Sequence, residues 1–358
     1  MKRDGTEFMF KFKKPSLIGL DISSTAVKLL ELSKTGNTYR VEAHAVEPLP
    51  PNAVIEKNIN DIEAVGATII KAVKRSGTKS KEAAIAVAGS AVITKIINMP
   101  ANLTDSEMES RIEMEADQYI PYPLEEINLD FEVIGPDEKR PDQVEVLLAA
   151  SRSENVEIRT AALEIAGLKP RIVDVEAYTI ENVSKLLAPQ LSLPEESLLA
   201  VVDVGATMTS LSVMANGRLI YTREQNFGGR QLTEEIMRRY SLPYDEAGKL
   251  KKEGGLPDSY VPEILEPFKE TMSQQVGRFM QFFYTAGQYN SVDAIVLGGG
   301  CASIPGIDEL IESELGIPAS IANPFANMTL SSGIKPQHLS NDAPSLLIAC
   351  GLALRSFD

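Results

Sequence analysis

Two segments of the sequence could bind phosphate, because each places an aspartate ahead of small and hydroxyl-bearing residues. The first segment contains Asp21, Ser23, Ser24, Thr25 and Lys28, and the second contains Asp203, Gly205, Ala206 and Thr207. A phosphate chain needs backbone amides that it can approach closely, hydroxyls that donate hydrogen bonds, and a carboxylate that can hold hydrated magnesium. Both segments supply this set, and Lys28 could also reach a phosphate. The alternative is that each aspartate only ends a strand by accepting hydrogen bonds from turn amides.

A third loop of small residues strengthens the phosphate interpretation. Gly298, Gly299 and Gly300 follow an apolar, strand-like run and precede a helix-like segment. A single run of three glycines is weak evidence for a ligand, since glycine also serves ordinary tight turns. Three loops of phosphate-binding type in one chain are harder to explain by turn formation alone.

The rest of the composition excludes several other kinds of chemistry. The chain has only His44 and His338, which cannot supply a zinc cluster or a convincing Ser/His/Asp triad. Cys301 and Cys350 cannot form a disulfide framework and lie in no metal-binding motif, which favours a reducing compartment such as the cytoplasm. A net charge of -15 disfavours nucleic acid and anionic lipid as partners. Acid, base and metal chemistry must therefore rest on carboxylates.

The phosphate loops need strands to hold them, and the apolar runs around each aspartate predict these strands. Residues 17–32 and 198–214 each read as a strand, a turn and a second strand. Aligning the two aspartates, which stand 182 residues apart, also pairs Thr25 with Thr207. A weak repeat at the spacing of one domain predicts two similar halves facing each other, and 358 residues suffice for two domains. Chance similarity between two apolar hairpins is the alternative.

Helix and strand patterns alternate between and after the hairpins, which predicts a mixed α/β class. An α+β insertion is predicted between the two hairpins. Its expected strands are 83–99, 127–135 and 144–151, and its expected helices begin near Thr104 and span 153–166.

The second half is expected to carry a helical insertion of its own. Its helices are predicted at 231–240, around Lys251, and along an apolar stripe from Val261 to Phe283. A strand at 293–297 should lead into the glycine loop, and Asp342 is expected to cap a closing helix.

The order of hairpin, hairpin and glycine loop resembles the superfamily of actin, Hsp70 and hexokinase. Within it, three stretches look like the PilM family of type IV pilus assembly proteins: residues 19–28, residues 115–126 with Tyr119-Ile-Pro-Tyr-Pro, and residues 343–354. The resemblance covers about residues 16–358 and extends to the cell-division protein FtsA.

This resemblance implies an actin-like, ribonuclease H-like duplicated two-domain fold with an FtsA-like 1C (SHS2-type) insertion. The implied parts are a flexible N-terminal segment 1–15, subdomain 1A (16–92, 172–197 and 335–358), subdomain 1C (93–171), subdomain 2A (198–230 and 284–334) and subdomain 2B (231–283).

The family resemblance also implies a role and partners. It implies a cytoplasmic ATP-binding adaptor that docks the N-terminal cytoplasmic peptide of PilN and links the inner-membrane alignment complex to the assembly motor. Such a protein would lie peripheral to the inner membrane through its partners, with the motor ATPases, the platform protein and further copies of itself as other contacts. For the peptide, we expect the face that joins the 1C insertion to the first domain.

Site roles carry over residue by residue from the resemblance, with ATP and Mg²⁺ as cofactors. Asp21 and Asp203 fall on the magnesium-side positions, and the hydroxyl and glycine residues that follow them fall on the phosphate loops. Gly298, Gly299 and Gly300 match the adenosine loop, with Gly229 and Lys251 as further nucleotide contacts. Glu176 matches a water-orienting or magnesium-side position, although a glutamate at a helix start is equally explained by the helix dipole.

Two departures from the relatives bear on this site. Gly248 stands where relatives such as MreB place a ribose-binding glutamate three residues before the lysine, which leaves the ribose contact open. The first loop reads Ile22-Ser23-Ser24 where many relatives have glycine, which makes close phosphate approach harder.

Other functions are weighed against the adaptor. An FtsA-like filament is one alternative, but the sequence stops at Asp358 just after a buried-looking helix, so we expect no amphipathic membrane-targeting helix. A small-molecule kinase is less favoured because no substrate-loop aspartate stands out. At most a slow ATPase is expected, since Glu176 is the only candidate for orienting water.

The N-terminal segment has Phe8, Phe10 and Phe12 between lysines. It lacks the continuous apolar core of a signal peptide.

Overall fold

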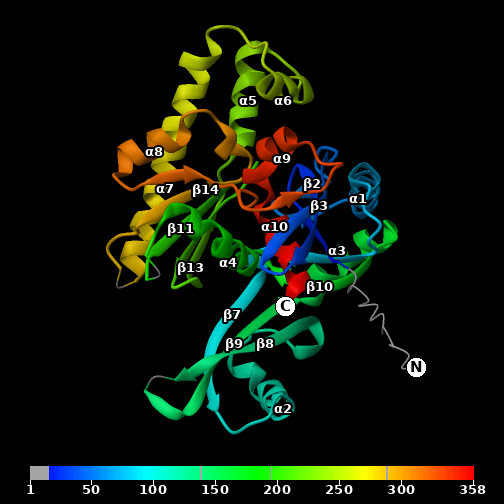
Figure 1. The fold of residues 1–358 in the computed structure, drawn as a ribbon, viewed down its shortest axis with the longest axis vertical. Helices are drawn as coiled ribbons and strands as arrows, with labels where there is room; N and C mark the ends of the chain where they lie inside the picture. Colours follow the sequence, from blue (N-terminus) through cyan, green and yellow to red (C-terminus); the bar gives the residue numbers. More distant parts are fainter. Residues whose placement is uncertain (1–15, 138, 195, 288) are drawn as a thin grey trace, which may run out of the picture.

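Two sheets with the same strand order form the centre of the molecule (Figure 1). The computed structural model describes residues 16–358 except 138, 195 and 288. The first sheet contains β1 (Ile18–Ile22), β2 (Ala26–Thr35), β3 (Thr38–Pro48), β6 (Glu82–Val87), β10 (Lys169–Val175) and β16 (Thr329–Leu330). The second contains β11 (Leu198–Val204), β12 (Thr209–Ala215), β13 (Arg218–Gln225), β14 (Ala294–Gly298) and β15 (Ala319–Ile321).

The two sheets repeat one topology. Their orders are β10-β6-β1-β2-β3-β16 and β13-β12-β11-β14-β15. Each contains three antiparallel strands (β1 to β3, and β11 to β13) with two parallel strands beside the first of them, and the first sheet has β16 as an additional edge strand. The register agrees as well, because Leu20 pairs with Leu29 in the first hairpin and Val202 pairs with Leu211 in the second. The predicted duplication into two similar halves is confirmed.

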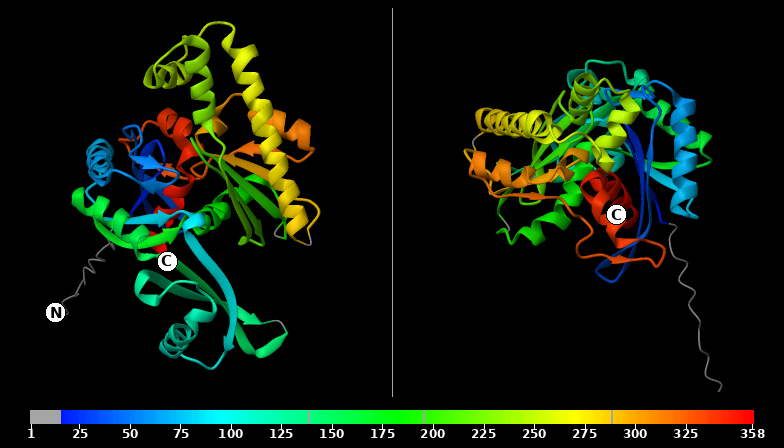
Figure 2. Two further views of the ribbon diagram at one scale, coloured as in Figure 1. Left: turned by 180° about the vertical axis from the view of Figure 1, so that it is seen from behind. Right: turned by 90° about the horizontal axis from the view of Figure 1, so that it is seen from above.

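Helices cover both faces of both sheets, which explains why the central strands are apolar on either side. Between the sheets lie α4 (Glu176–Leu187) and α10 (Leu347–Leu354). The outer face of the first sheet is covered by α1 (Ile62–Ser76) and α3 (Ser153–Ile165), and that of the second by α7 (Glu266–Ala286) and α8 (Ile307–Leu315). The view from above in Figure 2 shows this succession of layers. We call the first sheet with its helices the first domain, and the second sheet with its helices the second domain.

The helices between the sheets pack closely at two glycines. A Cβ atom on Gly19 of β1 would lie 2.1 Å from the carbonyl oxygen of Ala349 in α10. A Cβ atom on Gly351 of α10 would lie 2.1 Å from the carbonyl oxygen of Thr179 in α4. Only glycine allows backbone approach of this kind, so these residues fix how α10 sits between β1 and α4.

A smaller sheet projects from the first domain (Figures 1 and 2). Its order is β7-β9-β8, with β7 (Val92–Pro100), β8 (Ile127–Asp137) and β9 (Arg140–Arg152). Helix α2 (Asp105–Glu115) packs Met108 and Ile112 against this small sheet. The predicted start of α2 is confirmed, because Thr104 and Glu107 form a capping box. Helix α3 instead packs Ala162 and Leu163 into the core beneath the first sheet.

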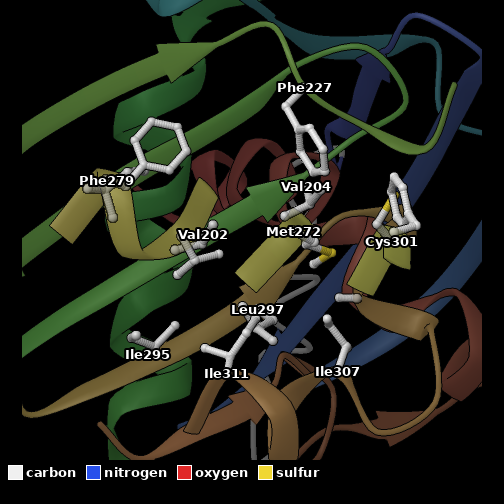
Figure 3. Packing of buried hydrophobic residues seen from close by; sticks show 14 of the residues in the cluster. Val202, Val204, Phe227, Met272, Phe279, Ile295, Leu297, Cys301, Ile307 and Ile311 are labelled. Atoms are coloured by element: carbon white, nitrogen blue, oxygen red, sulfur yellow. The ribbon is translucent and has the colours of Figure 1, made fainter. Parts of the chain in front are cut away.

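The second domain carries a helical unit with α5 (Gly229–Tyr240), α6 (Tyr244–Glu253), a π-helical turn (Val261–Leu265) and α7. Figure 3 shows Met272 and Phe279 of α7 against Val202 and Val204 of β11. The predicted apolar stripe is confirmed for most of its length, but Val261 at its start is 48% exposed. The π-helical turn explains this difference, since it shifts the residues before α7 out of the 3.6-residue period.

The expected cap of the closing helix is wrong. Asp342 is the last residue of α9 (Pro336–Asp342), has helical backbone angles and makes no capping hydrogen bond. A 3-10 turn (Ala343–Leu346) then leads into α10, so Pro344 marks the join between two helices.

The described part of the chain contains no helix long and apolar enough to cross a membrane. The expectations for residues 1–15, including Phe8, Phe10 and Phe12, lie outside the described residues.

Candidate functional site

The two hairpin turns that follow Asp21 and Asp203 meet between the domains. Ser24 Oγ and Thr207 Oγ1 lie 2.8 Å apart and share a hydrogen bond. Each turn is closed in the same way, because the amide of Ser23 donates to the carbonyl of Ala26 (3.0 Å) and that of Gly205 donates to the carbonyl of Met208 (2.9 Å). The structure therefore brings the two predicted phosphate loops together, with hydroxyl groups at their point of contact.

Asp21 is buried on β1 and paired with a lysine on the neighbouring strand. Lys28 Nζ lies 2.9 Å from Asp21 Oδ2, and the two residues are direct partners in the β1–β2 register. Burial by itself would lower the pKa of the Lys28 ammonium, but the carboxylates of Asp21 and Asp203 outweigh this and raise it. Lys28 is therefore charged, and the carboxylates of both domains stabilise its charge.

Asp203 occupies the matching place on β11, without a lysine opposite it. Its partner in the register is Ser210, where the first hairpin has Lys28. Burial raises the pKa of the Asp203 carboxyl, and Lys28 and Lys57 offset part of this. Asp203 Oδ2 would lie only 3.3 Å from a Cβ atom on Gly298, so the glycine loop begins directly beside this carboxylate.

The three glycines of the third loop serve different needs. Gly299 has φ +81° and could carry no Cβ, which would lie 2.3 Å from the carbonyl oxygen of Val204. A Cβ on Gly300 would meet nothing within 4 Å, so this residue faces open space. The loop thus packs tightly on the strand that holds Asp203 and leaves its last residue accessible to a ligand.

Gly229 and Lys251 lie beside the second phosphate loop. The amide of Gly229 donates to the carbonyl of Gly205 (3.0 Å), and the amide of Arg230 donates to that of Ala206 (2.7 Å). Lys251 Nζ donates to the carbonyl of Gly229 (3.0 Å) and to the hydroxyl of Thr233 (2.6 Å). The lysine therefore binds the first turn of α5 and lies at the edge of the site.

Two residues of the first predicted phosphate loop, Ser23 and Thr25, form hydrogen bonds within the protein. The hydroxyl of Ser23 donates to the carbonyl of Ala26 (2.8 Å), which closes its own turn. The carbonyl of Thr25 accepts from the amide of Leu49 (2.9 Å) and ties the turn to the end of β3. These contacts hold the loop in shape, while Ser24 faces the other domain.

Glu176 is the first residue of α4, which follows β10 directly. Its carboxylate forms an ion pair with Lys57. Lys57 Nζ also lies 3.6 Å from Glu224 Oε1 on β13 of the second domain. Burial raises the pKa of Glu176, and Lys57 opposes that rise. For Lys57, burial alone would lower the pKa, but Glu176 and Glu224 raise it overall. An ion-pair chain thus crosses between the domains.

Sequence reasoning missed Lys57 and Glu224. Lys57 lies in the turn between β4 (Val54–Ile55) and β5 (Asn58–Ile59), where Glu56 has φ 48° and Lys57 has φ 65°. Such turns are usually recognised by Asn-Gly or a similar pair, and two long charged residues give no such signal. Two consecutive non-glycine residues with left-handed backbone angles are the mark of a constrained site, but they are visible only in the structure.

The site gathers charges of both signs. Four carboxylates, those of Asp21, Glu176, Asp203 and Glu224, interact there with the ammonium groups of Lys28 and Lys57, and the Arg159 guanidinium also interacts with Glu176. Over residues 16–358, with the three gaps noted above, no group of three or more ligating side chains converges as a metal cage. Magnesium commonly needs only one or two carboxylates when phosphate oxygens and water complete its shell.

Comparisons with known proteins agree with the duplicated architecture. The model of the family described as type IV pilus assembly protein PilM matches residues 19–357. A chain of the PilM-PilN type IV pilus biogenesis complex is 27% identical, covers 97% of this chain and 100% of its own, and has a TM-score of 0.79.

Two further proteins are similar to this chain, one in sequence and one in fold. The cell division protein FtsA of Bacillus subtilis (strain 168) is 24% identical over 349 residues, which are 86% of this chain and 78% of FtsA. The ethanolamine utilization protein EutJ from Carboxydothermus hydrogenoformans is 15% identical, with a TM-score of 0.55 over 96% of this chain and 90% of its own. The predicted actin-like fold is confirmed. Because the family match spans nearly all of the described residues, this chain belongs to the PilM family of type IV pilus assembly proteins.

Proposed function

We propose that the protein is an ATP-binding adaptor of the type IV pilus machinery, which binds Mg-ATP between its domains and docks the N-terminal cytoplasmic peptide of PilN. The observation that carries the nucleotide part is the meeting of the two turns at Ser24 and Thr207, directly beside Asp21 and Asp203. Facing turns with hydroxyl groups at their point of contact, small residues and nearby carboxylates suit a triphosphate with its cation.

The magnesium ion would be held by Asp21 and Asp203 through its water shell. The triphosphate would lie against the turns at Ser23–Thr25 and Gly205–Thr207, and the adenosine would lie against the glycine loop 298–300. Gly300 supports this arrangement because a ligand could approach its open side. Gly229 and Lys251 border the second turn and would contact the nucleotide from α5 and α6.

Slow turnover, or none, suits the environment of Glu176. A general base must be free to accept a proton from the attacking water. The Glu176 carboxylate is instead paired with Lys57, and no second carboxylate stands free at the start of α4. This supports a nucleotide-dependent switch more than a fast ATPase or a kinase.

Peptide docking is supported by a cavity of about 330 Å³ where the small sheet joins the first domain. We call this cavity the junction groove. It is lined by Glu56, Asn58, Ala88, Ser90, Ala91, Val92, Ile93, Tyr122, Ala150, Arg152 and Asn155. Its walls combine five aliphatic side chains with six polar or charged ones, so a short extended peptide could be held there by hydrogen bonds as well as by apolar contacts. The solved relative in complex with PilN makes the PilN peptide the first partner to test. Docking would keep the protein in the cytoplasm, peripheral to the inner membrane.

Nucleotide binding is tested by thermal unfolding with and without Mg-ATP. A ligand at about 100 times its Kd stabilises the folded state by about 2.7 kcal/mol. We expect this shift in the wild type and in an Asp258→Asn control, whose side chain is exposed and remote from the hairpin turns. We expect Asp203→Ala to lose most of the shift. No shift in the wild type would refute nucleotide binding, and an equal shift in Asp203→Ala would place the nucleotide elsewhere.

Peptide docking is tested by filling the junction groove. Ser90 is exposed at its rim, so Ser90→Trp would block the cavity with little change to the core. We expect the affinity for a synthetic PilN N-terminal peptide to fall at least tenfold, or about 1.4 kcal/mol. Ser110→Trp, on the exposed side of α2, serves as the control. Unchanged affinity in Ser90→Trp would show that the peptide binds elsewhere.

A further inference from the structure

One side chain of the second domain contacts the first domain directly behind the junction groove. Glu224 extends from β13, the edge strand of the second sheet. Its Oε1 lies 3.6 Å from Lys57 Nζ and would lie 3.3 Å from a Cβ atom on Gly89. Its Oε2 is buried and has no hydrogen-bond partner among the described residues.

The two segments that Glu224 contacts are the walls of the groove on the first-domain side. Lys57 lies between Glu56 and Asn58, which both line the groove. Gly89 lies between Ala88 and Ser90, which form the neighbouring part of the wall. The groove lining and the Glu224 contact therefore belong to the same two short segments.

The hairpin that carries Lys57 is braced, so that a displacement of its side chain is passed to the groove. Arg159 of α3 is buried, and its Nη2 donates to the carbonyl of Lys57 (2.8 Å). Its Nη1 donates to the carbonyl of Asn155 (2.9 Å), and Asn155 also lines the groove. Because the turn is tight and its backbone is held, the segment has little room to absorb a movement of Lys57 locally.

The other end of this chain of contacts reaches the interdomain site. Lys57 also pairs with Glu176 at the start of α4. Glu224 stands on the same sheet as Asp203, with only β12 between their strands, so the two residues move together when the second domain moves. A change in the separation of the Asp21 and Asp203 turns therefore changes the distance between Glu224 and Lys57.

We propose that Glu224 is a positioning residue that couples the interdomain site to the junction groove, acting through Lys57. A ligand that sets the separation of the domains then sets the shape of the groove, and a peptide in the groove sets the separation of the domains. Thermodynamic linkage requires the two effects to be equal. This coupling rests on the proposed function, because it assigns regulation to the same nucleotide site and peptide groove.

The test compares peptide affinity with and without Mg-ATP. For the full chain, the Kd of the synthetic PilN N-terminal peptide is measured by titration in both conditions, and the ratio of the two values reports the coupling. We expect a ratio that differs from one by about fivefold or more in the wild type. In Glu224→Gln, which keeps the shape and removes the charge, the ratio should approach one. In the control Glu234→Gln, an exposed residue paired within α5, the ratio should equal that of the wild type.

A double-mutant cycle shows whether Glu224 acts through Lys57. Lys57→Met should also bring the ratio close to one, and the double variant should be no different from either single variant. Thermal unfolding of each ligand-free variant verifies that it is folded. If Glu224 had only a structural role, Glu224→Gln would lower the midpoint of thermal unfolding and leave the ratio of the two peptide Kd values as in the wild type.

The outcomes separate this coupling from the proposed function. If ATP or the peptide does not bind the wild type at all, the proposed function fails. If both bind but the wild-type ratio is one, the function stands and the coupling is refuted. If the wild-type ratio differs from one and Glu224→Gln keeps it, coupling exists but does not pass through Glu224.

Discussion

Asp203 carries a charge that is costly to the ligand-free fold, which suits the role proposed for it at a cation site. The residue is half-buried on β11 and pairs with Ser210 in the register, whereas Asp21 has Lys28 in the corresponding place. Burial penalises the charged form, which is why the pKa of Asp203 is raised. Packing alone does not explain a half-buried carboxylate without a lysine opposite it in the register, and an incoming cation would add to the positive charge of Lys28 and Lys57.

The first prediction at this scale is that Asp203→Asn stabilises the ligand-free protein. A raised folded-state pKa means that ionisation costs stability, so the charge is least favourable once the pH exceeds that pKa. The variant should therefore unfold at a higher temperature than the wild type at neutral pH. The difference should vanish as the pH falls below about 3.9, the value for an unperturbed aspartate. Thermal midpoints measured without nucleotide across this range give the result.

The same variant should lose the stabilisation by Mg-ATP, which separates stability from binding. An Asp203→Asn protein that is less stable than the wild type at neutral pH would contradict the assignment of a costly charge. A variant that is more stable and still fully responsive to Mg-ATP would remove Asp203 from the cation site.

The residues of the site divide into those that a sequence can reveal and those that it cannot. Asp21 and Asp203 could be predicted because the hairpins around them repeat at a fixed spacing, and a repeat is visible in one dimension. Lys57 and Glu224 could not be, because their roles arise from a turn and an edge strand that meet only after both domains have folded. No periodicity or motif marks a single charged residue that finds its partner across a domain boundary.

At the scale of elements, α10 is held by close backbone contacts on two sides. Gly19 lets β1 approach α10, and Gly351 lets α10 approach α4. The helix is apolar all round, as expected for one enclosed by two sheets. Because α4 also begins with Glu176, this packing sets the position of one of the charged groups of the site.

The second prediction concerns two glycines in helices. Gly351→Ala would place a Cβ 2.1 Å from a backbone oxygen of α4, so α10 would have to shift. We expect a loss of about 3 kcal/mol or more in the free energy of unfolding. Gly248→Ala, in α6 with nothing within 4 Å of the new Cβ, should instead stabilise by about 1 kcal/mol. Denaturant unfolding of both variants measures these changes, and equal effects would contradict the close packing of α10.

Elements with local signals could be predicted, and those fixed by distant contacts could not. The capping box at Thr104 and Glu107 marks the start of α2 because both partners lie within one turn of helix. The prediction for Asp342 was wrong because the local pattern has two meanings. An aspartate ahead of a proline is typical of a helix N-cap, but Asp342 ends α9 just before the turn that contains Pro344. The close packing of α3 on α1 depends on Gly66 and Ile165, which are far apart in sequence.

At the scale of the whole molecule, the two domains share one core. Leu30 and Leu32 of the first sheet and Val201 and Val296 of the second belong to a single cluster of buried residues around α4 and α10. The small sheet has separate apolar clusters around Met108 and Ile120. Domains that share a core should unfold together, whereas a sheet with its own small core can open separately.

The third prediction follows from this division. We expect calorimetry to show one main unfolding transition for both domains, which Val201→Ala should move to a lower temperature. Met108→Ala should leave that transition in place and increase hydrogen exchange in α2 and β9. If the two domains melted in separate transitions, the shared core would not hold them together as described.

The sandwiching of α10 between the sheets also has a consequence for the order in which the protein is made. Strand β1 is synthesised before the second domain, but α10, which covers it, follows only after β11 to β15 of that domain. The nascent second domain can complete its sheet as soon as β15 emerges from the ribosome. At that point the face of β1 and β2 that α10 will cover is still exposed to solvent. Chaperones that recognise exposed apolar strands should therefore meet this chain through its first domain.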